Sequence, residues 1–582
     1  MACWGVDRAA ALLLAGAVGF WGIGCGSNET GSGGSGATGS GGSGGGGATG
    51  GTGGKATSAY DPAHVVQVEI TMAPADWDSL RFQVNDIEQL LGGECLSGPK
   101  DSVFTYFPGS VKLDGQDFPE VAVRKKGFLG SMSASRPSLK IKLDEVDPNA
   151  RYFEADKLTL NNVKQDGSRI RTCLAFELFA AAGVPSPRCS FAHVVVNGED
   201  LGIYANVENI GKGMLATHFE NPDGNLYEGQ MSDFRPDWEN TYEKKTNETD
   251  PDRSDVTALT TALTAVDADL LAQVSERVDM DAFLTFWAAE SMLAAWDGYT
   301  GDQNNHQVYH DPTTDKFYFI PWSPDATFDS ANPLSDGTTP QSVYASSALP
   351  NRLYKLPEIR EQYRTRLLEL IDKVMVPDTV LPEIDRMEAL LSPYLASDPE
   401  FGEGLTQIRS FVKDRAAVLK AEVQNGPAAF APDMPVPPCV IPVGAINGTF
   451  ETKLALQTPD NPFVAGDGTL HLDLNNMPAD GNTVGSMASV EGNSINIMIV
   501  ALMPGGQISV VVFVIDPTLI KKGGDLPIDA QQAFGIHGKV ASGDQFQLLG
   551  FLTGGTLHLD EAGLNEGDVF KGTFTAKALS WP

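Results

Sequence analysis

Two short stretches decide how the rest of the chain is interpreted: WDGYTGDQNNH at residues 296–306 and FIPWSPD at residues 319–325. The first is polar and punctuated by glycine, and it lies between an apolar helical pattern and a strand pattern. Together they place Asp297, Asn305 and Asp325 on the two sides of a predicted hairpin. Phosphoryl transfer uses such a set, because one carboxylate handles the acceptor hydroxyl while an Asn and a second Asp hold Mg²⁺. The competing interpretation is that these residues only form turns.

A basic region precedes this acidic one. VAVRKKGFLGS at residues 121–131 predicts a strand, a basic cluster that includes Arg124, and a Gly/Ser-rich loop. SLKIKL at residues 138–143 alternates strictly, so Lys140 and Lys142 face the same side of a strand. Strand lysines beside a loop of backbone N–H groups suit a polyphosphate. A solvated strand face would show the same pattern.

Six blocks, in this order, resemble the CotH kinase family, a group of secreted, atypical protein-kinase-like proteins first known from bacterial spore coats. The blocks are VRKKG at 123–127, RPSLKIKL at 136–143, NNVKQDGSRIR at 161–171, VNGEDLGIY at 196–204 followed by Glu208, NNHQVY at 304–309, and FIPWSPD at 319–325. One such block is weak evidence, but six in order are strong. They cover about residues 64–425 and leave both ends of the chain outside the resemblance.

The resemblance implies a kinase fold that uses ATP and Mg²⁺ or Mn²⁺. Asp297 resembles the catalytic Asp that handles the acceptor hydroxyl, and Asn305 and Asp325 resemble the metal ligands. The nucleotide-binding residues would be Arg124, Lys140 or Lys142 at the phosphates, and Glu208 as the acid paired with the lysine. The sequence does not separate the two lysines.

The chain departs from the family pattern at three points. Ser323 stands where the family often has a first metal-binding Asp, and Asp302 is a candidate for supplying the missing charge. The separation between Asp297 and Asn305 is longer than in many members. His306 and its neighbour replace the usual tyrosines after the Asn. These departures leave open an active kinase, a kinase with altered metal use, or a pseudokinase.

The predicted fold class is α+β. A two-lobed, atypical protein-kinase-like domain is expected at residues 58–425, with two helices within 257–296. A proline-rich linker follows at 426–445, and a small all-β, sandwich-like domain at 446–582. The hexapeptide GTLHLD occurs at residue 468 and again at residue 555, which predicts two similar hairpins in that domain.

The N-terminus resembles a bacterial lipoprotein signal. Residues 1–24 would be removed, Cys25 would be acylated, and the Gly/Ser-rich segment 25–57 would be a flexible tether. We therefore expect an extracytoplasmic lipoprotein attached to a membrane through its lipid alone, with plain secretion as the alternative. The four cysteines of the folded part allow three pairings, between which the sequence does not choose.

The net charge of the chain bears on which classes of macromolecule it could bind. The chain has 75 acidic and 41 Lys and Arg residues, a formal net charge of −34. Such a surface argues against nucleic acid as a partner, because phosphate neutralisation needs excess cations. The expected function is transfer of the γ-phosphoryl of ATP to Ser or Thr of a surface or envelope protein. The alternatives are a non-catalytic surface or adhesion protein and, more remotely, transfer of AMP.

Overall fold

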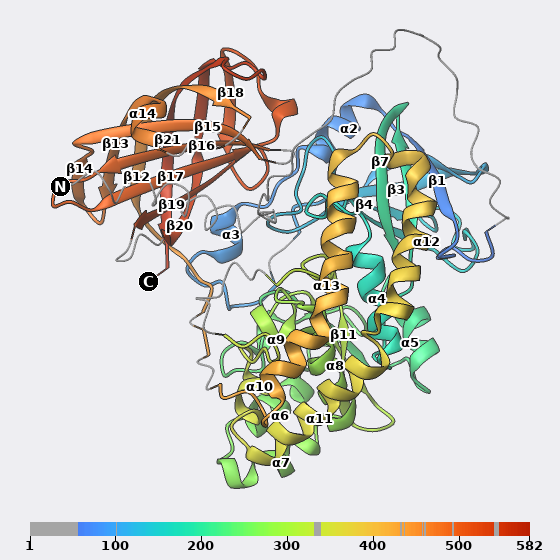
Figure 1. Ribbon diagram of the computed structural model, residues 1–582. Helices are drawn as coiled ribbons and strands as arrows, with labels where there is room; N and C mark the ends of the chain where they lie inside the picture. Colours follow the sequence, from blue (N-terminus) through green and yellow to red (C-terminus); the bar gives the residue numbers. More distant parts are fainter. Residues whose placement is uncertain are drawn as a thin grey trace, which may run out of the picture.

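The computed structural model describes residues 56–99, 102–330, 339–430, 434–435, 437–456, 458, 461–491, 494–540 and 546–581. Cys25, the predicted signal peptide and nearly all of the predicted tether lie outside these ranges. Figure 1 shows three bodies: a β-barrel in blue and teal, a mainly helical body in green and yellow, and an all-β body in orange and red. The predicted mixture of helices and strands is confirmed.

The N-terminal body is a closed barrel with strand order β1-β2-β3-β4-β5-β7-β6, in which β1 and β6 pair in parallel and all other neighbours are antiparallel. Its strands are β1 (Val65–Thr71), β2 (Phe107–Leu113), β3 (Gln116–Lys126), β4 (Ser138–Lys142), β5 (Lys157–Asn161), β6 (Cys189–Val196) and β7 (Glu199–Val207). Three helices accompany it: α2 (Pro74–Arg81), α3 (Ile87–Leu91) and α4 (Arg171–Ala181).

Alternation along the strands decides which side chains face the barrel interior. Leu139 and Ile141 of β4 are fully buried in its core, so Lys140 and Lys142 lie on the outer face, as predicted. A two-residue turn joins β6 to β7. Asn197 and Gly198 both have positive φ, at 52° and 85°, which a tight two-residue hairpin turn requires.

The second body is mainly helical. Its helices are α5 (Lys212–His218), α6 (Ser254–Ala262), α7 (Asp267–Ser275), α8 (Met280–Leu293), α9 (Tyr299–Asp302), α10 (Ala348–Leu353), α11 (Pro357–Lys373), α12 (Pro377–Leu395) and α13 (Pro399–Val423). The prediction of two helices within 257–296 is wrong, because Asp279 caps a new helix at the N–H of Ala282 and so separates α7 from α8. No helix in the described ranges has the length and apolar character needed to cross a membrane.

A four-stranded sheet inside this body is flanked by the two polar stretches at residues 296–306 and 319–325. Its order is β11-β10-β8-β9, formed by β8 (Asn225–Gly229), β9 (Glu243–Lys244), β10 (His306–Asp311) and β11 (Lys316–Pro321). His306 opens β10 opposite Pro321, which closes β11. The N–H of Trp322 donates to the carbonyl of Asn305 at 3.1 Å. The hairpin therefore brings its two flanking loops together.

Helices α12 and α13 connect the helical body with the N-terminal barrel, alongside which they run in Figure 1. Arg169, which is 3% exposed, forms ion pairs with Asp398 and Glu400 at the start of α13. The Gln67 side chain of β1 donates to the hydroxyl of Tyr394 in α12 at 3.0 Å. These polar contacts fix the barrel relative to the helices, and hence the two sides of the cavity described below.

The C-terminal domain is one sheet that closes on itself, so the predicted sandwich is wrong. Its strands are β12 (Ile441–Ala455), β13 (Asp467–Leu474), β14 (Met477–Asp480), β15 (Thr483–Glu491), β16 (Ser494–Leu502), β17 (Ile508–Ile515), β18 (Gly524–Ile528), β19 (Ala533–Val540), β20 (Phe546–Glu561) and β21 (Val569–Ser580), with a short helix α14 (Pro462–Ala465). The long strand β12 begins inside the predicted linker and pairs with β21 on one edge and β13 on the other. That double pairing closes a barrel, and the regular strand spacing is common to barrels and sandwiches.

The repeated hexapeptide occupies β13 and β20. In each copy the histidine bonds an aspartate of a neighbouring short strand: His471 to Asp480 of β14 at 2.7 Å, and His558 to Asp525 of β18 at 2.6 Å. Each copy also lies on the first strand of an antiparallel hairpin, β13–β14 for the first copy and β20–β21 for the second. The prediction of two hairpins is therefore confirmed, although the second hairpin has the longer loop.

Two disulfides choose among the three possible pairings. Cys173 is joined to Cys189, which links α4 to β6 within the N-terminal barrel region. Cys95 is joined to Cys439, across a sequence separation of 344 residues. The second bond ties the segment after α3 to the chain just before β12.

Candidate active site

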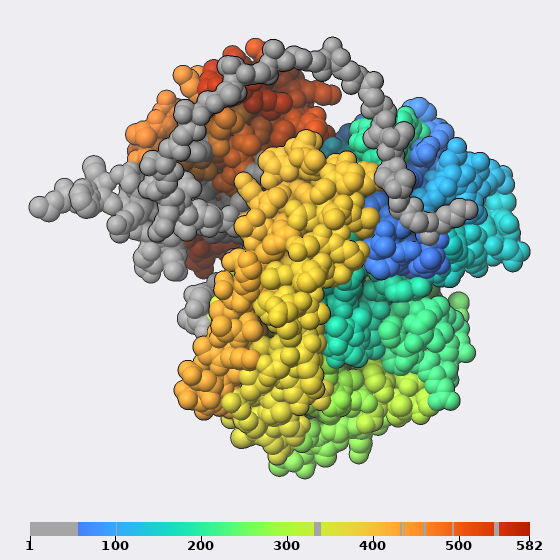
Figure 2. All heavy atoms as spheres, turned by 45° about the vertical axis from the view of Figure 1, so that its right-hand side comes forward, coloured from blue at the N-terminus to red at the C-terminus, as the bar shows by residue number. Residues whose placement is uncertain are grey.

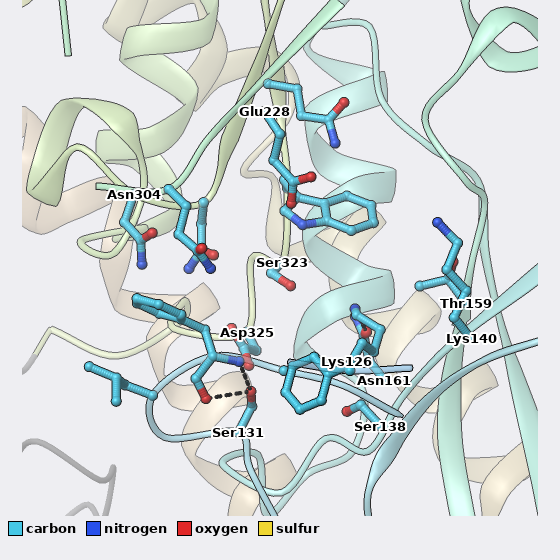
Figure 3. A pocket seen from close by; sticks show the side chains of 18 of the residues that line it. Lys126, Ser131, Ser138, Lys140, Thr159, Asn161, Glu228, Asn304, Ser323 and Asp325 are labelled. Carbon is cyan, nitrogen blue, oxygen red and sulfur yellow. Dashed lines mark hydrogen bonds between the residues drawn. The ribbon is translucent and has the colours of Figure 1, made fainter. Parts of the chain in front are cut away.

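A cavity of about 280 Å³ gathers most of the predicted site. It lies between the outer face of the N-terminal barrel and the loops that flank the β10–β11 hairpin, and Figure 3 shows side chains from both pointing into it. Its lining includes Arg124, Lys140, Asp297, Asn305 and Asp325. The fold thus brings five of the predicted residues together from segments far apart in sequence.

Three cations on the outer faces of β3 and β4 form one side of the cavity, here called the basic wall: Arg124, Lys126 and Lys140. Arg124 pairs in register with Lys140, so the two charges lie on adjacent strands. Burial, and then Arg124, lower the pKa of Lys140 to about 8. Partly buried cations that repel one another favour an anionic ligand.

Lys142 and Glu208 are not part of this cavity, which corrects the prediction for both. Lys142 is on the same face as Lys140, but it lies further along β4 and forms an exposed ion pair with Glu145 at 2.8 Å. Glu208 is 7% exposed and binds Arg188, whose Nη2 lies 2.6 Å from its Oε1. Glu208 is therefore engaged by Arg188 rather than by a lysine of the cavity. Of the two lysines that the sequence left equivalent, Lys140 lines the cavity and Lys142 does not.

Lys126 is the residue of the basic wall that the sequence prediction omitted. Its ammonium binds the Oδ1 of Asn161 on β5 and lies 5.2 Å from the ring centre of Trp322. Burial lowers its pKa to about 8, against the opposing effect of Glu228. The signal was the alternation of β3, because Val123 and Lys125 are fully buried and the alternate residues Arg124 and Lys126 therefore face outward.

Glu228, at the end of β8, is an acidic residue that lines the cavity, whereas Glu208 does not. Burial alone would raise its pKa, but Lys245, Lys126 and Lys140 outweigh burial and hold the pKa below its usual value. Its carboxylate lies 2.7 Å from the ammonium of Lys245. No motif in the sequence indicated this residue, because its position depends on the pairing of β8 with β10.

The opposite side of the cavity, here called the acidic floor, consists of Asp297, Asn305 and Asp325. The side-chain amide of Asn305 donates to one carboxylate oxygen of Asp297 at 2.7 Å, and Asn304 donates to the other at 3.0 Å. Asp325 follows β11 on a turn in which its N–H donates to the carbonyl of Ser323 at 2.9 Å. The two amides therefore fix the orientation of the Asp297 carboxylate.

The two carboxyls of the floor, Asp297 and Asp325, both have raised pKa values. Burial, and then the charge of Asp302, raise the pKa of Asp297 well above its usual value, and Asp325 adds to this. Burial, and then Asp166, raise the pKa of Asp325 to about 6, although Lys126 lowers it. Asp302 is close enough to affect Asp297 but does not line the cavity, so it does not replace the carboxylate missing at Ser323.

These residues fit a divalent cation shared with a phosphate ligand. Among the described residues, no three His, Cys, Asp or Glu side chains are grouped closely enough to hold a metal ion by themselves. Mg²⁺ commonly binds through one or two carboxylates together with substrate phosphates and water. Asp325 and the amide oxygen of Asn305 match that donor set, with the carboxylate of Asp297 beside them.

Strained backbone concentrates around the floor. Ala294, Gln303, Asn305, Ser323 and Phe328 are non-glycine residues with φ between 43° and 57°. Such conformations cost free energy and cluster at functional sites, where the surrounding structure over-determines them. Asn and Asp tolerate this region better than most residues, so the backbone at Ser323 is compatible with the Asp that the family often has there.

Two buried side chains hold the floor in place from behind. Glu290 of α8 accepts bonds from the N–H groups of Tyr299 and Thr300, at 3.1 and 2.8 Å, and so anchors the turn after Asp297. His306 is fully buried, with Nδ1 3.1 Å from the carbonyl of Asn304 and Nε2 3.2 Å from the hydroxyl of Tyr242. Since a carbonyl can only accept, Nδ1 carries the proton.

The sequence matches the family described as CotH kinase protein over residues 123–425. It is 25% identical to the inner spore coat protein H of Bacillus subtilis (strain 168) over 285 residues, 46% of this chain and 78% of that protein. It is 23% identical to the invasin CotH7 of Rhizopus delemar over 268 residues, 41% of this chain and 43% of that one, and 23% identical to the invasin CotH2 over 345 residues, 52% and 54%. The chain thus spans about half the length of these two invasins.

Among solved structures, the proinflammatory kinase CtkA of Helicobacter pylori aligns with 50% of this chain and 90% of its own, at 12% identity and a TM-score of 0.26. The family match includes the basic wall and the acidic floor, and extends over the helices to the end of α13. The chain belongs to the CotH kinase protein family.

Proposed function

We propose that this protein is an ATP-dependent protein kinase that transfers the γ-phosphoryl group to a Ser or Thr hydroxyl of a surface or envelope protein. The observation that carries the proposal is one cavity with three cations on one side and two carboxylates with an amide on the other. Positioning and charge neutralisation account for most of the catalysis of phosphoryl transfer, and this arrangement can supply both.

Each side has its own role. Arg124, Lys126 and Lys140 hold the phosphate chain, since ammonium and guanidinium groups form strong bonds to phosphate oxygens. Asn305 and Asp325 would hold Mg²⁺ or Mn²⁺, which neutralises charge on the phosphates. The barrel and the helical body would then act as the two lobes of the kinase.

Asp297 orients the acceptor hydroxyl and accepts its proton. The amides of Asn304 and Asn305 keep both of its oxygens aligned. Burial raises the pKa of this carboxyl well above its usual value, and a divalent cation bound nearby would favour the ionised form that can accept the proton.

An extracytoplasmic, lipid-anchored location is part of the proposal. It is supported by the two disulfides, which persist in oxidising compartments. The names of the relatives, a spore coat protein and invasins, agree with such a place. Cys25 would carry the lipid, and labelling with a fatty-acid analogue, lost in Cys25→Ser, tests this.

The test of the activity is incubation of the protein with Mg²⁺ and ATP labelled at the γ-position, with a generic acceptor such as casein and with itself as acceptor. Label on Ser or Thr, absent when Asp297 is replaced by Asn, supports the proposal. Adduct mass separates a phosphoryl from an adenylyl group, and an adenylyl adduct would replace phosphoryl transfer by AMP transfer.

Ser323 favours a second candidate, a non-catalytic surface protein. With Ser at position 323 the floor lacks one of the carboxylates that the family often has, and fewer charged ligands bind a divalent cation more weakly. A folded protein that neither binds nor turns over ATP with Mg²⁺ or Mn²⁺ would support this candidate against the first.

A further inference from the structure

The C-terminal barrel packs against the edge of the candidate active site. An apolar cluster joins its outer face, through residues such as Val500 and Ile536, to the buried side chains of Ile87 and Met132 from the N-terminal part. Figures 1 and 2 show this domain beside the N-terminal barrel, above the helical body. Buried apolar side chains from both domains form one shared hydrophobic cluster at this contact.

The same contact reaches the cavity lining. Leu90, Phe104 and Leu129 line the cavity and also pack against this apolar cluster. Leu129 belongs to the loop of residues 127–132, here called the glycine loop, which begins directly after Lys126. The loop is braced internally by the hydroxyl of Ser131, which bonds both the N–H and the carbonyl of Phe128 at 3.2 and 3.3 Å (Figure 3).

A buried lysine connects the base of the loop to the C-terminal barrel. Lys125 is fully buried, and its ammonium donates to the carbonyls of Arg81 and Gln83, at 2.8 and 2.6 Å, and to the Oε1 of Gln531. Gln531 lies between β18 and β19, and its amide nitrogen donates back to the carbonyl of Arg81 at 3.2 Å. A buried ammonium needs all three acceptors, and the barrel provides one of them.

Three further links support this attachment. Ser135, just after the glycine loop, donates to Asp516 of the barrel at 2.6 Å. Lys577 of β21 forms an ion pair with Glu88 of α3 at 2.6 Å. The disulfide from Cys95 to Cys439 is a covalent link between the same two parts. The barrel thus holds the glycine loop from one side and α3 from the other.

We propose that the C-terminal barrel is a positioning element of the active site, with Gln531 as its principal positioning residue. By accepting from Lys125 it fixes the glycine loop at the edge of the cavity and raises the affinity of the cavity for its phosphate ligand. This inference rests on the proposed function for the identity of that ligand, but not for the ordering of the loop.

Hydrogen–deuterium exchange in the intact protein tests the ordering of the loop. Gln531→Met keeps the length of the side chain but removes the acceptor, and should speed exchange at residues 127–132 by about 3- to 10-fold, as expected for one lost hydrogen bond. Gln531→Glu keeps an acceptor and should restore slow exchange. Lys571→Met, which breaks an exposed ion pair to Glu451 elsewhere on the barrel, is the matched control and should change nothing at the loop.

Unchanged exchange in Gln531→Met, or equal acceleration in the control, would overturn the proposal. If Gln531→Met does not fold, Gln531→Asn withdraws the same acceptor by one methylene and is subject to the same criterion. This readout needs no nucleotide, so it stands even if the proposed kinase function fails.

Kinetics then tests the link to the ligand. In a wild-type protein that uses MgATP, Gln531→Met should raise the KM for ATP by about 3- to 10-fold and leave kcat within about twofold, with rescue by Gln531→Glu. A loosened loop with an unchanged KM would refute the role in affinity. Absence of any nucleotide binding in the wild type would instead refute the proposed function and leave the exchange result to decide this inference.

Discussion

The basic wall and the acidic floor face each other across one cavity but are built in different ways. The wall stands on two paired strands of a closed barrel, β3 and β4, where alternation points every second side chain outward. The floor stands on two loops that include strained backbone at Asn305 and Ser323, held by buried groups behind them. This difference implies that the wall supplies binding, which tolerates graded loss, whereas the floor supplies chemistry that depends on a few oriented atoms.

The largest effect is expected at the floor. Asp297→Asn keeps the shape of the side chain but removes the base, so turnover should fall by about 10²- to 10⁴-fold while nucleotide binding stays within a few fold. Phosphate transfer from labelled ATP measures the first quantity and calorimetry the second. The control is Asp315→Asn, in an exposed turn of the β10–β11 hairpin, which should leave both unchanged. Turnover near the wild-type rate in Asp297→Asn would remove Asp297 from the chemistry.

The floor should also be the acid-sensitive side, because of His306. Its pKa of about 4 in the folded protein is below the 6.5 of an exposed histidine, so the unfolded chain binds the extra proton. This contribution to stability is complete above pH 6.5 and is lost as the pH falls toward 4, by up to about 3 kcal/mol. Urea unfolding at a series of pH values measures it.

A variant without the titrating group provides the comparison. His306→Gln should unfold with a flatter dependence on pH between 6.5 and 4 than the wild type. Identical slopes in the two proteins would show that His306 is not buried as a neutral group.

The wall should respond more gently. Lys126→Met removes a cation that lies opposite Asp325, and the nucleotide Kd should rise by about 10- to 100-fold, as expected for the loss of a charge-assisted hydrogen bond. Lys142→Met is the matched control, because the Lys142 side chain lies on the same face of the barrel but points to solvent, where it pairs with Glu145. Equal loss in the two variants would mean that general surface charge, rather than the wall, holds the phosphates.

The smallest expected change is a gain. Ser323→Asp adds a carboxylate at a position whose φ of 45° an Asp accepts. Affinity for Mg²⁺ in the presence of nucleotide should rise by about 3- to 10-fold, since added ligand charge tightens such sites. Weaker metal binding in this variant would show that position 323 does not face the metal.

The sequence predicted the floor more completely than the wall. Asp297, Asn305 and Asp325 were predicted from their order around a hairpin together with the family resemblance, and all three line the cavity. Among the basic residues, alternation placed Lys140 and Lys142 on one face but could not say how far along the strand the cavity extends.

Other features depend on long-range pairing, which no local pattern encodes. Glu228 reaches the site only because β8 pairs with β10. Glu208 forms an ion pair with Arg188 and does not reach the cavity. Closure of the C-terminal sheet needs β12 to pair at both edges, and the strand spacing of a sandwich is the same. The contact between Lys125 and Gln531 joins residues far apart in sequence, and a basic cluster at the end of a strand gave no indication of a buried ammonium.

The measurement that tests the central claim most directly is calorimetric titration of ATP into the folded protein with Mg²⁺ and then Mn²⁺, alongside Asp325→Ala. We expect metal-dependent binding that the variant loses, because Asp325 lies on the floor opposite Lys126 of the wall. No binding with either metal in a protein shown to be folded, or equal binding by the variant, would contradict it.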